Sequence, residues 1–404
     1  MIYASIDVGS YSTKMVVVRY DKDDKSFDVI GSTSVHTVGI KKGIITDKAM
    51  LKKTILLGKS EIEKQIGFKI DKAIISLPCY DLEVTIHNGI IYTDGVITGN
   101  DITTCFRNTI KDNISDDREV ITVFPIDFTV DDEDKYADPK GVNGYKLETR
   151  ILISTLPKEL VYSYLDLFND CKIEVIDITI GPVADYYQAK REDFNIKLGA
   201  VVNIGSSKTE VSVFNKGLLV KATTLPIGSK SIDHDINYIY GFDKTTSRSL
   251  KEGFAFATSS YANSDEVIEY ESLSGEKKTI NQLELSQIVE ARLDEILKNV
   301  KKSLKTLTNR EISYIIVTGG ISNIPGFNYL LENIFGDITY MVNMNAMGVR
   351  SNVYSTCYGS VKYYYDKLEL RGINETMYDE KKIDIDGNGY SNMIDKMQSF
   401  MDNN

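Results

Sequence analysis

The sequence predicts an α/β protein with two similar halves around one cleft, and three stretches predict it. The first is a strand, a Gly–Ser turn and a second strand over residues 3–19, and the second repeats this pattern over residues 202–213. The two copies align without a gap, and Gly9 matches Gly205. The third is a buried-type strand with a Gly-Gly turn and a helix start over residues 314–326.

The first part of the chain alternates short strands with helices. Asp47 predicts a helix N-cap, and Pro182 fits the first turn of a later helix. The expected strands are 2–9, 13–20, 26–34, 72–78, 82–86, 88–91, 120–130, 147–156 and 174–179, and the expected helices are 49–67, 98–113 with a cap near Asn100, 157–168 and 181–190.

The second part opens at Leu198 with strands that run through Thr224. Residues 258–281 are polar and are typical of a loop or a hairpin. From Arg371 the composition becomes polar and charged, which predicts a linker. The helices expected in this part are 229–240, 247–253, 286–307 and 354–368.

The Gly–Ser turns have the chemistry of a phosphate site. Glycine lets backbone N–H groups approach an anion closely, and hydroxyls add donors. Asp7, at the end of the incoming strand, could face a hydrated Mg²⁺. One such hairpin fits an ordinary turn equally well. The second copy and the third stretch favour a nucleotide site, in which Gly319 and Gly320 leave room for a base or ribose.

These three stretches resemble the two phosphate hairpins and the adenosine motif of the actin-like ATPase superfamily. Within it the chain resembles the FtsA family, bacterial division proteins that tether FtsZ filaments to the membrane. Residues 116–132, 138–144 and 147–148 are similar to the subdomain by which FtsA differs from actin, chaperones and sugar kinases. The resemblance covers roughly residues 3–370. It implies an actin-like (ribonuclease H-like) two-domain α/β fold with an inserted α+β subdomain.

The resemblance also implies a division of the chain. The first actin-like domain is expected at 1–78, 157–194 (first connecting helix) and 341–371 (second connecting helix), with the inserted FtsA-type subdomain at 79–156. The second domain is expected at 195–225 and 309–340 (adenosine motif), with an outer, FtsZ-binding subdomain at 226–308. A flexible linker at 372–390 and an amphipathic membrane-targeting helix at 391–404 are expected to follow.

Site residues follow from the same resemblance, which implies ATP and Mg²⁺ as ligands. Lys251 lies where the family has a helix that faces the ribose and adenine. Asp7 is the expected Mg²⁺-side carboxylate, through water. The residues expected to bind the nucleotide are Asp7, Gly9, Ser10, Tyr11, Ser12, Lys14, Asn203, Gly205, Ser206, Ser207, Lys208, Lys251, Gly319, Gly320 and Ile321.

The chain departs from the family pattern at several of these positions. Asn203 replaces an Asp, Ser206-Ser207 replaces Gly-Gly, and Arg248 replaces a Glu. Gly181 stands where relatives place a Glu or Gln that can orient the attacking water. Since an amide is no base and attracts a hydrated cation less than a carboxylate does, we expect ATP–Mg²⁺ binding with weak or absent hydrolysis. No catalytic residue is assigned.

The C-terminal stretch predicts a peripheral membrane anchor. Five apolar residues share one face of a helix, although the basic polar face usual in such anchors is missing. A helix that docks on its own domain or on a partner is the alternative. The apolar residues are Met393, Ile394, Met397, Phe400 and Met401.

An overlapping stretch, residues 384–395, is similar to an EF-hand Ca²⁺ loop. Its twelfth position is Asp395 rather than Glu, position eight is Ser391, and no helix precedes it convincingly. A solvated Asp/Gly linker explains the pattern adequately, so we expect no Ca²⁺ site.

Composition bounds the remaining function classes. The net charge of −11 argues against nucleic-acid binding. Four scattered cysteines and three histidines argue against a structural zinc site and favour reduced thiols in a cytosolic protein. No apolar run reaches the ~18–20 residues that span a bilayer, and we expect no signal peptide.

The resemblance implies self-association into protofilaments, binding of the FtsZ C-terminal tail and of downstream divisome proteins, and a place on the inner face of the cell membrane at the division site. Two alternatives stay open. A pilus-assembly actin homologue of the PilM type shares the insert. A phosphotransferase of the same superfamily would need an acid or base aimed at a substrate hydroxyl, and Gly181 and Asn203 offer none.

Overall fold

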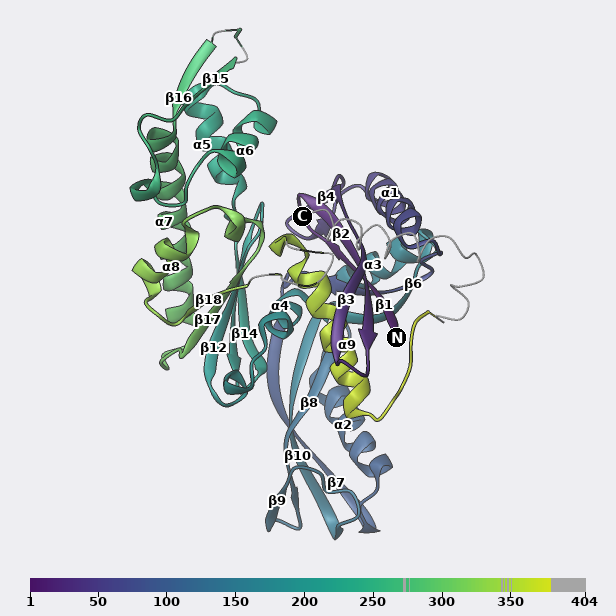
Figure 1. Ribbon diagram of the computed structural model, residues 1–404. Helices are drawn as coiled ribbons and strands as arrows, with labels where there is room; N and C mark the ends of the chain where they lie inside the picture. Colours follow the sequence, from purple (N-terminus) through teal and green to yellow (C-terminus); the bar gives the residue numbers. More distant parts are fainter. Residues whose placement is uncertain are drawn as a thin grey trace. The chain divides into compact units, whose positions relative to one another are not determined.

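The computed structural model describes residues 1–378 apart from 272–273, 276, 343, 345, 347–348 and 350 (Figure 1). The described chain forms two compact units. The larger comprises Met1–Cys79 and the chain from Leu165 onward, and the smaller comprises Tyr80–Tyr164.

The larger unit contains a five-stranded sheet of order β11-β6-β1-β2-β3. Strands β1, β2 and β3 form the antiparallel meander that the sequence predicts. Strand β6 pairs in parallel with β1, and β11 pairs in parallel with β6. Six of the seven residues of β1 are buried, so this strand is covered on both faces. The strands are β1 (Ile2–Val8), β2 (Ser12–Asp21), β3 (Ser26–His36), β6 (Lys72–Leu77) and β11 (Glu174–Ile180).

A second sheet of the same unit has the order β14-β13-β12-β17-β18. Strands β12, β13 and β14 are antiparallel, and β17 and β18 follow in parallel. Both sheets therefore share one order and one set of strand directions, which confirms the prediction of two similar halves. The strands are β12 (Leu198–Ile204), β13 (Thr209–Asn215), β14 (Leu218–Leu225), β17 (Tyr314–Thr318) and β18 (Thr339–Met341).

Helices α4 (Gly181–Ala189) and α9 (Ser355–Leu370) pack against each other and connect the two sheets. Helix α9 contacts β1, β2 and β6, whereas α4 contacts both β11 and β12. A Cβ on Gly359 would lie 1.9 Å from the carbonyl oxygen of Ala184, so only glycine permits this close crossing. In Figure 1 both helices lie between the two sheets.

Helix α1 (Lys48–Ile66) packs on β2 and β3, and Asp47 caps it as predicted by accepting from the Met50 N–H at 3.0 Å. The two-residue strands β4 (Ile40–Lys41) and β5 (Ile44–Ile45) precede it. The second half adds α5 (Lys230–Tyr240), α6 (Lys244–Gly253), β15 (Val267–Glu271), β16 (Lys277–Asn281), α7 (Gln282–Leu307) and α8 (Phe327–Phe335), with 3₁₀ turns at Glu192–Ile196, Ser259–Tyr261, Gly320–Asn323 and Asn352–Tyr354.

Helix α7 begins four residues before its predicted start. Asn281 caps it by accepting from the Glu284 N–H at 3.1 Å, a signal that the sequence interpretation missed. Its buried stripe packs against β13 and β14, which explains its length. The stripe comprises Leu285, Val289, Leu293, Ile296, Leu297, Val300 and Leu304.

The smaller unit is an antiparallel sheet of order β7-β10-β8-β9 with one long helix. Helix α2 begins after Thr98, which forms a capping box with Asp101, rather than near Asn100. Helix α3 begins one residue after the predicted Pro157 and leads out of this unit. The elements are β7 (Glu83–Val96), α2 (Gly99–Asn113), β8 (Arg118–Val130), β9 (Asp134–Tyr136), β10 (Asn143–Pro157) and α3 (Lys158–Asp170).

One expectation for this unit was wrong. Residues 82–86 and 88–91 do not form two strands, because β7 runs unbroken from Glu83 to Val96 opposite β10. Gly89 lies within this strand, where a Cβ would lie 2.1 Å from Thr109 Oγ1 of α2. The glycine is required so that the helix can lie close to the strand.

The residues that follow α9 contact the first sheet. Ile2 N–H donates to Thr376 Oγ1 at 2.8 Å, and Met377 N–H donates to the Ile2 carbonyl at 3.1 Å. The Tyr378 hydroxyl lies between the N–H and the carbonyl of Lys72. Residues 376–378, the end of the described chain, therefore lie against β1 and β6.

All four cysteines are free thiols, and all four are buried. Within the described ranges, no helix is both long and apolar enough to cross a membrane.

Candidate functional site

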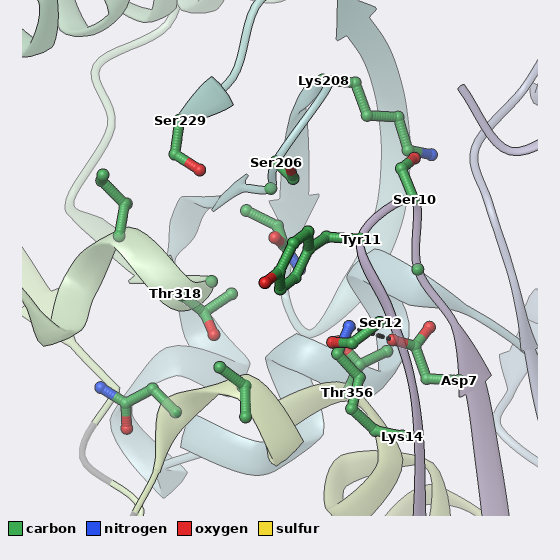
Figure 2. A pocket seen from close by; sticks show the side chains of 18 of the residues that line it. Asp7, Ser10, Tyr11, Ser12, Lys14, Ser206, Lys208, Ser229, Thr318 and Thr356 are labelled. Atoms are coloured by element: carbon green, nitrogen blue, oxygen red, sulfur yellow. Dashed lines mark hydrogen bonds and ion pairs between the residues drawn. The ribbon is translucent and has the colours of Figure 1, made fainter. Parts of the chain in front are cut away.

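A cleft of about 370 Å³ lies between the two halves of the larger unit (Figure 2). The β1–β2 turn lines it with residues 7–12, the β12–β13 turn with Gly205 and Ser206, and the chain after β17 with residues 318–321. The three stretches singled out in the sequence therefore meet at one cavity.

Gly9 makes the first turn tight. Its N–H donates to the Ser12 carbonyl at 3.2 Å. A Cβ at this position would lie 2.6 Å from Lys14 Nζ and 2.9 Å from the Ser12 oxygen. Only glycine therefore leaves the Lys14 ammonium in its place at the cleft.

Asp7 stands at the end of β1, directly opposite Lys14 of β2. Its Oδ2 lies 3.2 Å from Lys14 Nζ, and its Oδ1 accepts from the Ser76 hydroxyl at 2.7 Å. Both carboxylate oxygens thus have partners, and the carboxylate fits an outer-sphere contact to a hydrated cation better than direct ligation. Within the described residues, no three His, Cys, Asp or Glu side chains form a metal-holding group.

The second turn is held from the side of α5. The carbonyls of Gly205 and Ser206 accept from the N–H groups of Ser229 and Lys230 at 2.9 and 2.8 Å. A Cβ on Gly228 would lie 2.5 Å from the Gly205 oxygen, so glycine is needed where the chain passes the turn. The start of α5 therefore fixes the position of the second turn in the cleft.

Gly319 fixes the third turn. Its φ of +103° lies in the region that favours glycine, and a Cβ would lie 2.4 Å from the Ile204 oxygen. The turn can therefore lie directly on the end of β12. Gly320 and Ile321 follow it along the cleft wall.

A buried carboxylate stands behind the cleft. Asp185 of α4 is fully buried, and its oxygens accept from Asn203 Nδ2 at 2.6 Å and from Thr356 Oγ1 at 2.7 Å. Burial raises the pKa of Asp185 to about 7; the two hydrogen bonds oppose this shift, and the charges of Glu210 and Asp7 reinforce it. The carboxylate orients the Asn203 amide, which lines the cleft.

Glu210 of β13 also lines the cleft, and the sequence prediction omitted it. Its Oε1 accepts from Lys208 Nζ at 2.5 Å and from the Cys79 N–H at 3.1 Å. Burial by itself lowers the pKa of Lys208, but the neighbouring Glu210 raises it overall. A signal was present, because Glu210 takes the place in the second hairpin that Lys14 takes in the first. Glu210 pairs with Asn203 across β12 and β13, as Lys14 pairs with Asp7 across β1 and β2.

Lys251 of α6 lines the cleft but is only 1% exposed. Its Nζ donates to Asp233 Oδ1 of α5 at 2.5 Å, and burial lowers its pKa. The ammonium is therefore part of a buried ion pair between two helices.

Arg248, one turn earlier on α6, reaches across the cleft to the first turn. Its guanidinium carbon lies 3.2 Å from the ring centroid of Tyr11, and its Nε donates to Glu252 at 2.7 Å. The Tyr11 ring also meets His36 edge-on at 5.1 Å. Figure 2 shows Tyr11 pointing into the cavity.

Among the predicted nucleotide residues, Ser207 is the one that does not line the cleft. Its hydroxyl is buried and has no hydrogen-bond partner in the described part of the chain. The lining residues outside the prediction are Val8, Ser34, Gly43, Ser76, Leu77, Pro78, Gly181, Glu210, Ser229, Arg248, Glu252, Thr318, Asn323, Ile324, Ser351, Asn352, Val353 and Thr356. The predicted membrane residues 393–401 and the Ca²⁺-like loop 384–395 lie outside the described residues.

Two family models match this sequence. The model "Cell division protein FtsA" matches residues 200–359, and the model "SHS2 domain inserted in FTSA" matches residues 81–155. The cell division protein FtsA of Bacillus subtilis (strain 168) is 26% identical over 376 residues, which cover 92% of this chain and 85% of that protein.

Solved structures show the same fold at low sequence identity. The PilM–PilN type IV pilus biogenesis complex has a TM-score of 0.61 at 14% identity and covers 92% of this chain and 99% of its own. MreB5 of Spiroplasma citri bound to AMPPNP has a TM-score of 0.57 at 13% identity, and the match covers 92% of this chain and 99% of that one. The expected actin-like two-domain α/β fold with an inserted domain is confirmed, and the chain belongs to the FtsA family of cell division proteins.

Proposed function

We propose that this cell division protein binds ATP with Mg²⁺ in the cleft between its two halves. One observation carries the proposal: two Gly–Ser turns, which occupy equivalent places in two similar sheets, line a single cavity. Backbone N–H groups in such turns are a recurrent site for phosphate groups. Lys14 and Lys208, one from each turn region, supply positive charge at the same cavity.

The three turns have separate roles in this proposal. The turns at 9–12 and 205–206 hold the phosphates with Lys14 and Lys208, and residues 319–321 hold the nucleoside. Asp7 faces the hydration shell of Mg²⁺, whose remaining ligands are phosphate oxygens and water. The cation neutralises phosphate charge and fixes the conformation of the bound triphosphate.

Binding of a fluorescent ATP analogue to the full chain tests this proposal. Gly9→Val brings a branched side chain against Lys14 Nζ and the Ser12 carbonyl, and we expect affinity to fall at least tenfold. Gly253→Ala, at a position where a Cβ meets nothing within 4 Å, is the matched control. Equal affinity for all three proteins would refute the cleft as the nucleotide site.

We further propose the division role in detail. The chain polymerises through the inserted unit, binds the FtsZ C-terminal tail through residues 226–308, and recruits downstream division proteins at the septum. Membership of the FtsA family supports this proposal. Co-pelleting with FtsZ filaments tests the partner, and FtsZ without its C-terminal tail is the control. Equal pelleting with both filaments would refute tail binding and favour a PilM-like role.

Attachment to the inner face of the cell membrane is the last part of the proposal, and it depends on residues 391–404. Because the polar face of the predicted helix carries a single basic residue, Lys396, beside Asp395 and Asp402, apolar burial supplies most of the binding, and anionic lipid adds little. Liposome pelleting of the full chain and of a chain without residues 391–404 tests the anchor. Equal pelleting would refute it.

A further inference from the structure

We infer that Glu210 takes over the water-orienting role for which this chain has no side chain at Gly181. The inference rests on the proposed ATP site and assigns it a catalytic carboxylate. Gly181 opens α4 at the cleft, where relatives are expected to carry a Glu or Gln. A Cβ on Gly181 would lie 3.4 Å from Glu210 Oε2. The Glu210 carboxylate therefore occupies the neighbourhood into which a side chain at position 181 would extend.

The two oxygens of Glu210 have different environments. Oε1 is fixed by Lys208 Nζ at 2.5 Å and by the Cys79 N–H at 3.1 Å. Both hydrogen bonds from Lys208 and from the Cys79 backbone end on Oε1, the Cys79 thiol also interacts with the carboxylate, and Oε2 is the oxygen on the side of Gly181. Because Glu210 lines the cleft, a water molecule there can donate a hydrogen bond to Oε2.

Glu210 is also held rigidly. It lies on β13, whose partner β12 carries Asn203 directly opposite. The Cys79 N–H lies two residues beyond β6 in the first half, so groups from both halves set the position of one carboxylate. A carboxylate positioned in this way can align a nucleophile without further reorganisation.

The reaction assigned to this group is hydrolysis of the terminal phosphoanhydride of bound ATP. The water oxygen forms a bond to the γ-phosphorus as the bond from that phosphorus to the β,γ-bridging oxygen breaks. The bridging oxygen leaves with the bonding electron pair as part of ADP. Glu210 Oε2 accepts the water proton and returns it to phosphate or solvent after the step.

Two variants of the full chain test the assignment. Glu210→Gln keeps the shape but cannot accept the proton, and we expect single-turnover phosphate release at saturating Mg–ATP to fall by about 100-fold or more. Adding Gly181→Glu to that variant supplies a carboxylate from the neighbouring position. We expect this double variant to release phosphate at least tenfold faster than Glu210→Gln alone. A purely structural role for Glu210 would give no such rescue.

Glu63→Gln is the matched control. Glu63 also accepts from a lysine and from a backbone N–H, at 3.0 Å from Lys69 Nζ and 2.8 Å from the Ile70 N–H, and it does not line the cleft. We expect the phosphate-release rate of this variant to equal that of the unmodified chain.

Binding of the fluorescent ATP analogue separates the two proposals. We expect Glu210→Gln to bind within threefold of the unmodified chain. A chain that binds no nucleotide refutes the proposed function together with this assignment. A chain that binds ATP but releases no phosphate, or that releases it equally fast after Glu210→Gln, refutes only the assignment.

Discussion

Single backbone positions decide the shape of the cleft between the two halves, and Gly319 is the most constrained of them. Its φ of +103° and the 2.4 Å approach of a Cβ to the Ile204 oxygen leave no room for alanine. We expect Gly319→Ala to lower the free energy of unfolding by about 2 kcal/mol, the usual scale for a non-glycine residue forced into such a conformation. Urea denaturation measures this change.

Gly253→Ala is the comparison for that experiment, because a Cβ there meets nothing within 4 Å. We expect its unfolding free energy to lie within about 1 kcal/mol of the unmodified chain. Equal stability of the two variants would contradict the close approach at Gly319.

Asp185 should give the protein a characteristic pH dependence. Its folded-state pKa of about 7 lies above the ordinary value of 3.8, chiefly because of burial. The folded state therefore binds the proton more tightly than the unfolded state. This stabilisation is complete below pH 4 and is lost as the pH rises through 7.

The variant Asp185→Asn removes this titration. We expect the unfolding free energy of the unmodified chain to fall relative to the variant between pH 5 and 8, by on the order of 3 kcal/mol. Denaturation of both proteins at several pH values measures the difference. Glu210 and Asp7, which face the same region, are present in both proteins and do not explain a divergence. Parallel pH profiles would contradict the prediction.

The sequence predicts site residues best where the chemistry is local. The turns at Gly9 and Gly205 are visible because glycine and serine have strong turn preferences. The role of Asp185 cannot be predicted from local sequence, because its partners Asn203 and Thr356 meet it only through tertiary packing. Ser207 illustrates the opposite error, since the expected hydroxyl is present but does not face the cleft.

At the scale of elements, the Lys251–Asp233 pair links α6 to α5. Both side chains are at least 90% buried, so removing one leaves an unpaired charge. We expect Lys251→Met to lower the unfolding free energy by about 3 kcal/mol or more. Adding Asp233→Leu should restore most of this loss, because a well-packed apolar pair can replace a buried ion pair.

The same double variant tests whether Lys251 contacts the nucleotide. Because its ammonium is already bonded to Asp233, we expect ATP affinity to change less than threefold. A loss of tenfold or more would place Lys251 among the direct contacts. The sequence reveals only that Lys251 lies on a helix; its partner lies on another helix, 18 residues earlier in the chain.

Strands and helices are predicted well where each carries its own pattern. The meander of β1–β3 and the cap at Asp47 follow from alternation and local hydrogen bonding. Strand β7, predicted as the two strands 82–86 and 88–91, does not, because its continuous length is fixed by pairing with the distant strand β10. A residue whose role is set by a distant neighbour is where reasoning from one sequence fails.

At the scale of the larger unit, the Tyr11–Arg248 contact joins the two halves across the cleft. The Tyr11 ring points into the cavity in which we propose that the nucleotide binds (Figure 2). A cation–π contact of this kind is worth about 0.5–2 kcal/mol. We expect Arg248→Ala to free the ring and to raise the association rate of ATP by about twofold to tenfold, measured by stopped-flow fluorescence.

Tyr11→Phe keeps the ring under the guanidinium and serves as the control, with an association rate equal to that of the unmodified chain. Slower association after Arg248→Ala would contradict the prediction and would show that the guanidinium attracts the phosphates instead.

The short contact of residues 376–378 with β1 and β6 has a mechanical consequence. Tension applied to the chain beyond Tyr378 first loads the hydrogen bonds to Ile2 and Lys72. Those two residues start the strands whose far ends carry Asp7 and Ser76. A force on the chain beyond Tyr378 is therefore transmitted along β1 and β6 to Asp7 and Ser76, which line the cleft.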